Sequence, residues 1–238
     1  MKYTLVAIGY VIVIYIINII IGGVVYIFFP ELTRLTETVL ATVALCCSTV
    51  FTAFLLQKYI LKEPFRDIGF RKCSVSSIVR GMLMAATVLG ACFLTLNLAG
   101  YCTVEDVRGM STDWWVYLLI FILVGITEEV AFRGVVQRVL SKGMNKWIAW
   151  VVAACIFSLV HIDNDNFSFL PFVNILLAGL LLGGVYMYTN NLLYPISLHF
   201  FWNFLQGNVL GFSVSGNIIP HTNLKVFCTG SELMTGGA

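Results

Sequence analysis

The stretch Asp113–Leu140, DWWVYLLIFILVGITEEVAFRGVVQRVL, decides the fold of this chain. It is long enough to cross a membrane, because a spanning helix needs about 20 mostly apolar residues. Near its middle it carries two adjacent carboxylates, Glu128 and Glu129, followed by Arg133. A charge at the centre of a bilayer costs about 2.5–3.5 kcal/mol on insertion scales, so ionisable residues at that depth indicate a functional site.

The composition assigns the whole chain to the membrane class. Of its 238 residues, 59% are hydrophobic and 11% are charged, with a mean hydropathy of +0.92. A soluble domain carries about 25% charged residues, so this chain departs strongly from that class. The net charge of +2 gives no indication of nucleic-acid binding. The bilayer itself is therefore the first partner that the sequence predicts.

We expect an all-α, polytopic transmembrane bundle of about seven spans, with its active site at bilayer depth. The candidate spans are at about 3–29, 38–60, 77–100, 114–140, 147–161, 172–189 and 191–211, of which the fifth and sixth are short. The chain divides into N-terminal helices and connections (1–113), a core (114–211) and a C-terminal tail (212–238). The tail is too mixed to span, and its end, Gly236-Gly237-Ala238, is compatible with a truncated chain.

Basic and acidic residues are concentrated in different connections between the predicted spans. Basic residues flank the second and fourth connections, and acidic residues dominate the third and fifth. The basic group is Lys58, Lys62, Arg66, Arg71, Lys72, Arg80, Arg138, Lys142 and Lys146; the acidic group is Glu105, Asp106, Asp113, Asp163 and Asp165. The positive-inside rule then places the N-terminus in the cytoplasm and the tail outside. Short connections favour a bacterial plasma membrane.

Two further expectations concern the connections and the cysteines. The connection 62–74, KEPFRDIGFRKCS, alternates basic and apolar residues, which is compatible with a segment in the membrane interface or with an ordinary basic loop. The seven cysteines form no CxxC pair, and most lie in apolar stretches, where cysteine acts as a small hydrophobe. We therefore predict neither a disulfide framework nor a zinc ribbon.

The two glutamates are predicted to have different roles. Arg133 follows Glu129 at i,i+4, so the two side chains meet on one helix face and can form an ion pair. Glu128 points about 100° away and keeps a face of its own. A carboxylate left free in this way is suited to act as a general base. The spacing thus predicts a structural Glu129 and a reactive Glu128.

Two more motifs place polar groups in apolar spans. Phe157-Ser-Leu-Val-His161 ends the fifth span, and His199-Phe-Phe-Trp-Asn203 lies in the seventh. His199 and Asn203 share a helix face, and both can donate hydrogen bonds to a developing oxyanion. A single histidine in a bundle is commonly a packing residue. Several such groups at membrane depth need one another as partners, so we predict one shared site and give the tail residue His221 no role.

These motifs resemble those of the CPBP family, the CAAX-protease and bacteriocin-processing (Abi-type) group of intramembrane proteases. The family pattern is EExxxR, then FxxxH, then HxxxN or HxxxD. This chain supplies Glu128, Glu129 and Arg133, then Phe157 and His161, then His199 and Asn203. The match is in order and covers about residues 114–205, whereas the first three spans carry no comparable motif.

The resemblance implies a role for each of these residues. Glu128 would activate water, and His161 would bind and orient that water. His199 and Asn203 would form the oxyanion hole, while Glu129 and Arg133 would fix the geometry. A metal-free glutamate mechanism is favoured. The alternative is zinc bound by Glu128, His161 and His199, since two histidines and a glutamate form a known catalytic zinc set.

The implied activity is an intramembrane endopeptidase that cleaves a membrane-associated peptide or protein, for example in bacteriocin or pheromone processing or in self-immunity. A second reading is a non-proteolytic membrane protein that partners a sensor kinase or another membrane protein. A third is a transporter that uses the glutamates as a proton relay. The lack of internal repeats and of paired broken helices weighs against transport.

Overall fold

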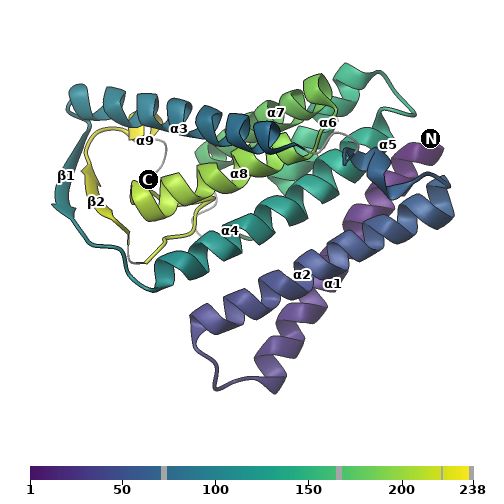
Figure 1. Ribbon diagram of the computed structural model, residues 1–238, viewed down its shortest axis with the longest axis horizontal. Helices are drawn as coiled ribbons and strands as arrows, with labels where there is room; N and C mark the ends of the chain where they lie inside the picture. The colour runs from purple at the N-terminus through teal and green to yellow at the C-terminus, as the bar shows by residue number, and fades with distance from the viewer. Residues whose placement is uncertain (71–73, 165–167, 221, 236–238) are drawn as a thin grey trace.

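The computed structural model describes residues 1–70, 74–164, 168–220 and 222–235. It confirms a helical membrane bundle, to which a two-stranded sheet is added at one end (Figure 1). The N-terminus lies at the other end, beside α5. Arg71, Lys72, Asp165 and His221, which entered the analysis of charges and motifs, lie outside the described residues.

The first half of the chain contributes three long helices: α1 (Lys2–Phe28), α2 (Arg34–Leu55), which continues as a π-helix through Leu56–Leu61, and α3 (Val75–Leu98). Polar caps set two of the starts. The hydroxyl of Thr33 accepts a hydrogen bond from the Thr36 amide, and that of Ser74 accepts one from the Ser77 amide. Such caps satisfy backbone donors that a helix leaves free at its N-terminus.

The second half contributes the remaining helices: α4 (Asp113–Glu129), the π-helix η3 (Val130–Gln137), α5 (Arg138–Leu140), α6 (Lys146–Leu159), α7 (Phe169–Thr189), α8 (Leu193–Phe204) and the π-helix η4 (Leu205–Val209). The segment α4–η3–α5 is one unbroken helical run. Its switch to π geometry begins directly after Glu129, and π segments are frequent at functional sites. A four-residue helix, α9 (Glu232–Thr235), follows the sheet.

Every predicted span is helical, but the lengths differ from expectation. Five described helices are long and apolar enough to cross a membrane: α1, α2 with its π-helix, α3, the α4–α5 run and α7. The sixth predicted span is therefore longer than expected, because α7 begins at Phe169 rather than at 172. The short helices are α6, with 14 residues, and the α8–η4 run of Leu193–Val209.

The sheet adds ordered structure to the tail and corrects the expectation about the cysteines. Strand β1 (Cys102–Val107) pairs antiparallel with β2 (Leu224–Cys228), so part of the tail is ordered structure. A disulfide joins Cys102 to Cys228 at the end of this pairing. The prediction that the chain carries no disulfide framework was wrong for these two cysteines. Their separation of 126 residues gave no local spacing to indicate the bond.

At the end opposite the sheet, the connection after α2 packs into the protein. Its short 3-10 helix (Phe65–Ile68) buries Ile68 completely. A Cβ built on Gly134 of η3 would lie 3.1 Å from Leu192 and 3.4 Å from Ile68, so these three residues are in close contact. The amide of Leu192 also donates to the Gly69 carbonyl, at 3.0 Å. The apolar side of this connection therefore faces protein rather than lipid headgroups.

An ion-pair network ties the same connection to α5. Arg138 donates to Oε2 of Glu63 at 2.5 Å and to Gln57 at 3.2 Å, and Lys142 pairs with Oε1 of Glu63. Burial by itself would raise the pKa of Glu63. The hydrogen bonds and charges of Lys142 and Arg138 outweigh burial and lower the pKa below its usual value of 4.5.

This network predicts a pH dependence of stability. Because the folded-state pKa of Glu63 is lowered, its stabilising contribution is complete above the unfolded-state value of about 4.3 and is lost as the pH falls through the folded-state pKa. We expect Glu63→Gln to lower Tm by about 2–4 °C at neutral pH, and the difference to disappear in acid. Thermal unfolding in detergent at several pH values measures this. A difference that persists unchanged in acid would contradict the role of the ionised carboxylate.

Candidate active site

Glu129 is the buried anchor of the site. Its side chain is fully buried, and its Oε1 accepts hydrogen bonds from Arg133 Nη1 at 2.7 Å and from His199 Nδ1 at 2.8 Å. The first contact confirms the predicted i,i+4 ion pair, although Arg133 lies in the π-helix rather than in α4. The second contact was not predicted. Together they fasten α8 to the α4–η3 run through one carboxylate oxygen.

Arg133 makes further contacts that the sequence pattern did not reveal. Its guanidinium lies over the ring of Phe157, 4.3 Å from the centroid, and Nη2 donates to the Gly179 carbonyl at 3.2 Å. One turn further along η3, Gln137 donates to the Gly183 carbonyl at 3.0 Å. The motif phenylalanine thus covers the face of the guanidinium, and two carbonyls of α7 accept hydrogen bonds from η3.

The spacing Gly179-xxx-Gly183 makes these contacts possible. Small residues allow helix backbones to approach closely in membranes. A Cβ on Gly179 would lie 3.2 Å from Ala154 and from Phe157, and one on Gly183 would lie 2.6 Å from Gln137 Oε1 and 2.8 Å from the Trp150 ring. This GxxxG pair was present in the sequence and was not used in its interpretation. It is the signal that could have predicted α7 as a neighbour of the site.

Two adjacent glycines of α7 supply a test of this packing. Gly183→Ala places a methyl group inside contact distance of Gln137 and Trp150, and overpacking of this kind costs about 1–3 kcal/mol. Gly184→Ala is the matched control, because its methyl group would meet Trp150 at an ordinary 3.6 Å. We expect a lower Tm for Gly183→Ala only. Equal stability of the two variants would contradict the close approach of α7 to η3.

Glu128 lies beside both motif histidines. Its Oε2 is 3.8 Å from Nε2 of His161 and 3.8 Å from Nε2 of His199, and its side chain keeps 25% of its exposure. His161 Nδ1 contacts the Phe157 carbonyl at 2.7 Å, and because a carbonyl only accepts, this nitrogen must carry a proton. His199 Nδ1 is held in the same way by Glu129. Both rings are therefore oriented with Nε2 toward Glu128.

The separation of these atoms leaves room for a small reactant. A distance of 3.8 Å is too long for a direct hydrogen bond, and polar groups at such a distance are often bridged by water. A water molecule beside Oε2 of Glu128 would be within reach of an Nε2 atom as well. The arrangement can therefore hold a water molecule against a carboxylate, which is the geometry that general-base catalysis requires.

Asn203 lies one turn beyond His199 on α8 and is buried. Its amide forms no hydrogen bond with another described residue, so it can still donate to a ligand. The structure thus brings Glu128, Glu129, Arg133, His161 and His199 into one connected cluster through contacts of their side chains. Asn203 shares the helix face of His199, as its spacing predicts.

The donor set was also compared with a zinc site. The Nδ1 hydrogen bonds of both histidines resemble the partners that orient zinc-bound imidazoles. Two ligands of tetrahedral zinc, however, lie about 3.4 Å apart for bond lengths of about 2.1 Å, which is closer than the 3.8 Å found here. No group of three His, Cys, Asp or Glu side chains among the described residues is placed to hold a metal ion. The observed spacing is wider than the spacing of two ligands on one tetrahedral zinc ion.

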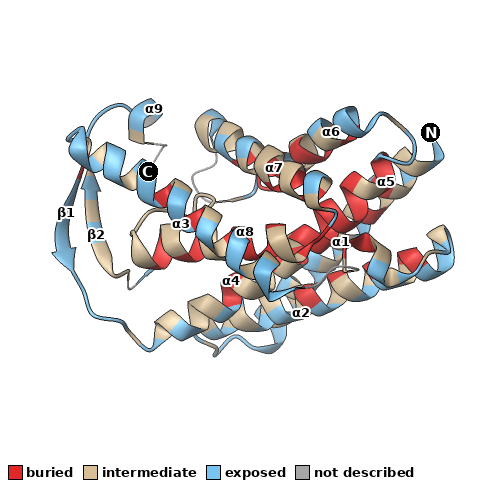
Figure 2. Ribbon diagram, turned by 45° about the horizontal axis from the view of Figure 1, so that its top comes forward, coloured by how far each residue is buried: buried red, intermediate tan, exposed pale blue. Residues whose placement is uncertain are grey.

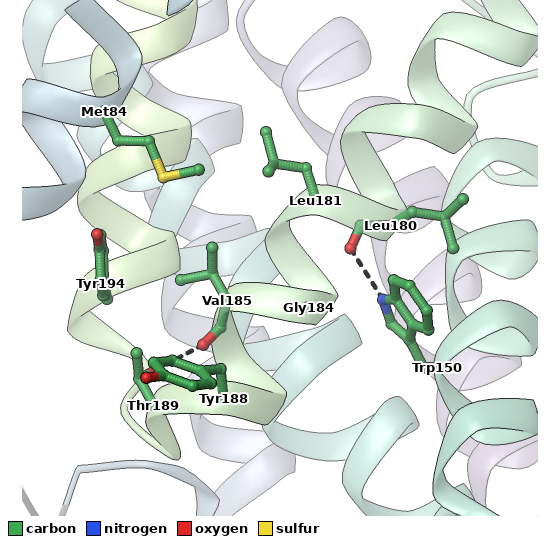
Figure 3. A pocket seen from close by; sticks show the side chains of 9 residues that line it. All are labelled: Met84, Trp150, Leu180, Leu181, Gly184, Val185, Tyr188, Thr189 and Tyr194. Atoms are coloured by element: carbon green, nitrogen blue, oxygen red, sulfur yellow. Dashed lines mark hydrogen bonds between the residues drawn. The ribbon is translucent and has the colours of Figure 1, made fainter. Parts of the chain in front are cut away.

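A groove on the surface of α7 lies away from this cluster (Figure 3). It has a volume of about 490 Å³ and runs over α7 between Met84 and Tyr194 on one side and Trp150 on the other. Trp150 forms part of one wall, and its indole nitrogen donates a hydrogen bond to the Leu180 carbonyl at 2.8 Å. The lining is apolar and includes none of the clustered ionisable groups. We therefore place the chemistry at the glutamates and not in this groove.

Comparison with known proteins supports the same part of the chain. Residues 110–205 match the family model described as "Rce1-like: Type II CAAX prenyl endopeptidase Rce1-like". No curated protein and no solved structure matches the chain. The matched segment begins just before α4 and ends at the first residue of η4, so it contains all three motifs.

The fold and the cluster define a multi-pass membrane protein with ionisable groups buried inside its bundle. Residues 110–205 match the model of the Rce1-like CAAX endopeptidases, which agrees with the resemblance found from the motifs. This family indicates a protease.

Proposed function

We propose that this chain is an intramembrane endopeptidase in which Glu128 activates a water molecule for attack on a peptide bond of a membrane-associated substrate. The observation that carries the proposal is the convergence of two imidazole Nε2 atoms on one carboxylate oxygen, each at 3.8 Å. The family match at 110–205 supports the reaction class. The roles of the individual residues are those that the resemblance implies, and the distances within the cluster support them.

The reaction can be followed through its protons. Glu128 removes one proton from the water as the oxygen attacks the carbonyl carbon, and it later delivers that proton to the leaving amine. His161 orients the water through Nε2, because its Nδ1–H is already given to the Phe157 carbonyl. General-base assistance of this kind contributes about 10²–10⁴ to the rate.

The carbonyl oxygen becomes negatively charged during the attack and needs donors. The amide of Asn203 can donate directly, because no other described residue uses it. His199 can donate from Nε2 only when both ring nitrogens carry protons, since its Nδ1–H is held by Glu129. Donors fixed in place before the reaction are a large part of the stabilisation of oxyanions by enzymes.

Glu128→Gln tests the proposal. The substitution removes the base but keeps the size of the side chain, so we expect cleavage to fall by about 10²–10⁴ while folding and membrane insertion are retained. The inactive variant should capture the substrate, which mass spectrometry of bound peptides would identify. Cleavage of that peptide by both proteins then gives the rate ratio. Full activity of the Glu128→Gln protein would rule out the mechanism.

Glu129→Gln is the matched control on the neighbouring residue. It leaves the guanidinium of Arg133 buried without a counter-charge, and breaking a buried pair in this way costs about 3–5 kcal/mol. We expect this variant to lose thermal stability, and the Glu128→Gln protein to retain it. The reverse pattern would exchange the roles assigned to the two glutamates.

The proposal routes no step through a metal. We expect activity to survive dialysis against a zinc chelator and the purified protein to contain substoichiometric zinc by elemental analysis. Loss of activity on chelation, with recovery on addition of zinc, would favour the alternative set of Glu128, His161 and His199.

Substrate capture also decides the biological role that we propose, which is the processing of a bacteriocin leader or a peptide pheromone in a bacterial plasma membrane. Recovery of a secreted peptide precursor would support this role. Recovery of a prenylated C-terminus would point to CAAX processing, which the family description names. If a Glu128→Gln/His199→Ala double variant fully complements a deletion strain, a non-proteolytic role as a partner would be favoured instead.

A further inference from the structure

We propose that water and the scissile peptide reach Glu128 from the end of the bundle that carries β1 and β2, and that this end faces away from the cytoplasm. The inference deepens the proposed function and rests on it, since it names the substrate as a segment cleaved from the extracytoplasmic side. Four features of the structure support it.

The first feature is the length of α6. Its 14 residues extend about 21 Å from Lys146, whereas the hydrocarbon core is about 30 Å thick. The turn after α6, which contains His161 and Asp163, therefore lies at membrane depth on the side away from Lys146. Irregular backbone at that depth is tolerated only inside protein or along a water-filled cavity. Asp163 is exposed, which fits a water-filled entrance.

The rim of this entrance is polar. Asp163 accepts a hydrogen bond from the hydroxyl of Tyr15 on α1, at 2.5 Å. Asn164 donates to the Ser215 carbonyl of the tail at 2.8 Å. Both contacts lie within three residues of His161 along the chain. A route past them leads from the sheet end to an imidazole that faces Glu128.

The second feature is the closure of the opposite end. Every residue from Glu129 to Gln137 is buried, and beneath them Ile68 and Leu192 press against Gly134. Figure 2 shows buried residues concentrated toward α5 and the N-terminus, while the ribbon around β1 and β2 is mostly exposed or intermediate. The proposal assigns the exposed 25% of the Glu128 side chain to the sheet end, because the opposite end is closed by packing.

The third and fourth features assign the sides of the membrane. The packed end carries the network of Glu63, Arg138 and Lys142 and the basic connections, which the positive-inside rule places in the cytoplasm. The sheet end carries the disulfide Cys102–Cys228, and disulfides persist in oxidising compartments outside the cytoplasm. Charge and redox chemistry thus give the same orientation independently.

Cysteine labelling tests the route. In a protein whose free cysteines are replaced by alanine and whose disulfide is kept, Glu128→Cys is treated with a charged, membrane-impermeant methanethiosulfonate reagent. We expect modification at least about tenfold faster in right-side-out than in inside-out membrane vesicles, because a charged reagent reaches bilayer depth only through a water-filled path. The replaced cysteines are the free Cys46, Cys47, Cys92 and Cys155, together with Cys73, which lies outside the described residues.

Cysteines at control positions show which side of the membrane the reagent reaches in each kind of vesicle. Val107→Cys on β1 should react in right-side-out vesicles, and Lys146→Cys at the start of α6 should react in inside-out vesicles. Val135→Cys in η3 should react in neither, because that side chain is fully buried. Asp163→Cys leaves both glutamates intact and reports on the entrance even if Glu128→Cys disturbs the site.

The results separate this inference from the proposed function. Reaction of Glu128→Cys and Asp163→Cys on the side of Lys146→Cys, or no reaction from either side, would overturn the route and leave the glutamate mechanism standing. Outward accessibility together with full activity of Glu128→Gln would overturn the mechanism and leave the route standing.

Discussion

The bundle around the site depends on one buried carboxylate. Glu129 holds Arg133 and His199 on a single oxygen atom, so it neutralises a guanidinium and orients an imidazole at the same time. A buried charge in a membrane must be paired, and this pairing joins the α4–η3 run to α8. The position of His199, and with it the space beside Glu128, follows from that bond.

The guanidinium of Arg133 has two further partners, the backbone carbonyl of Gly179 and the ring of Phe157. Gly179 has no side chain to separate α7 from Ala154 and Phe157 of α6, and its carbonyl accepts a hydrogen bond from Arg133. Phe157 covers the face of Arg133 and, through its own carbonyl, orients His161. Phe157 thus contacts Arg133 with its ring and His161 with its backbone carbonyl. These two contacts explain why a phenylalanine occurs in a pattern of polar groups.

Much of this could be predicted from the sequence, because the strongest signals are local. Helical periodicity gave the Glu129–Arg133 pair, and hydropathy gave a helix in each of the seven expected stretches. The bond between Glu129 and His199 spans 70 residues, and no periodicity links positions on different helices. The strand pairing and the disulfide were missed for the same reason, since Cys102 and Cys228 acquire their meaning only when the tail folds back.

The disulfide also makes a covalent ring of the chain between Cys102 and Cys228, and the whole of residues 110–205 lies inside it. Closing a loop of this size can restrict the unfolded chain by about 5 kcal/mol. A cut in any connection between α4 and α8 would leave both fragments attached to each other. A protease built in this way could be nicked, by itself or by another enzyme, and still keep its motif helices in one molecule until a reductant releases them.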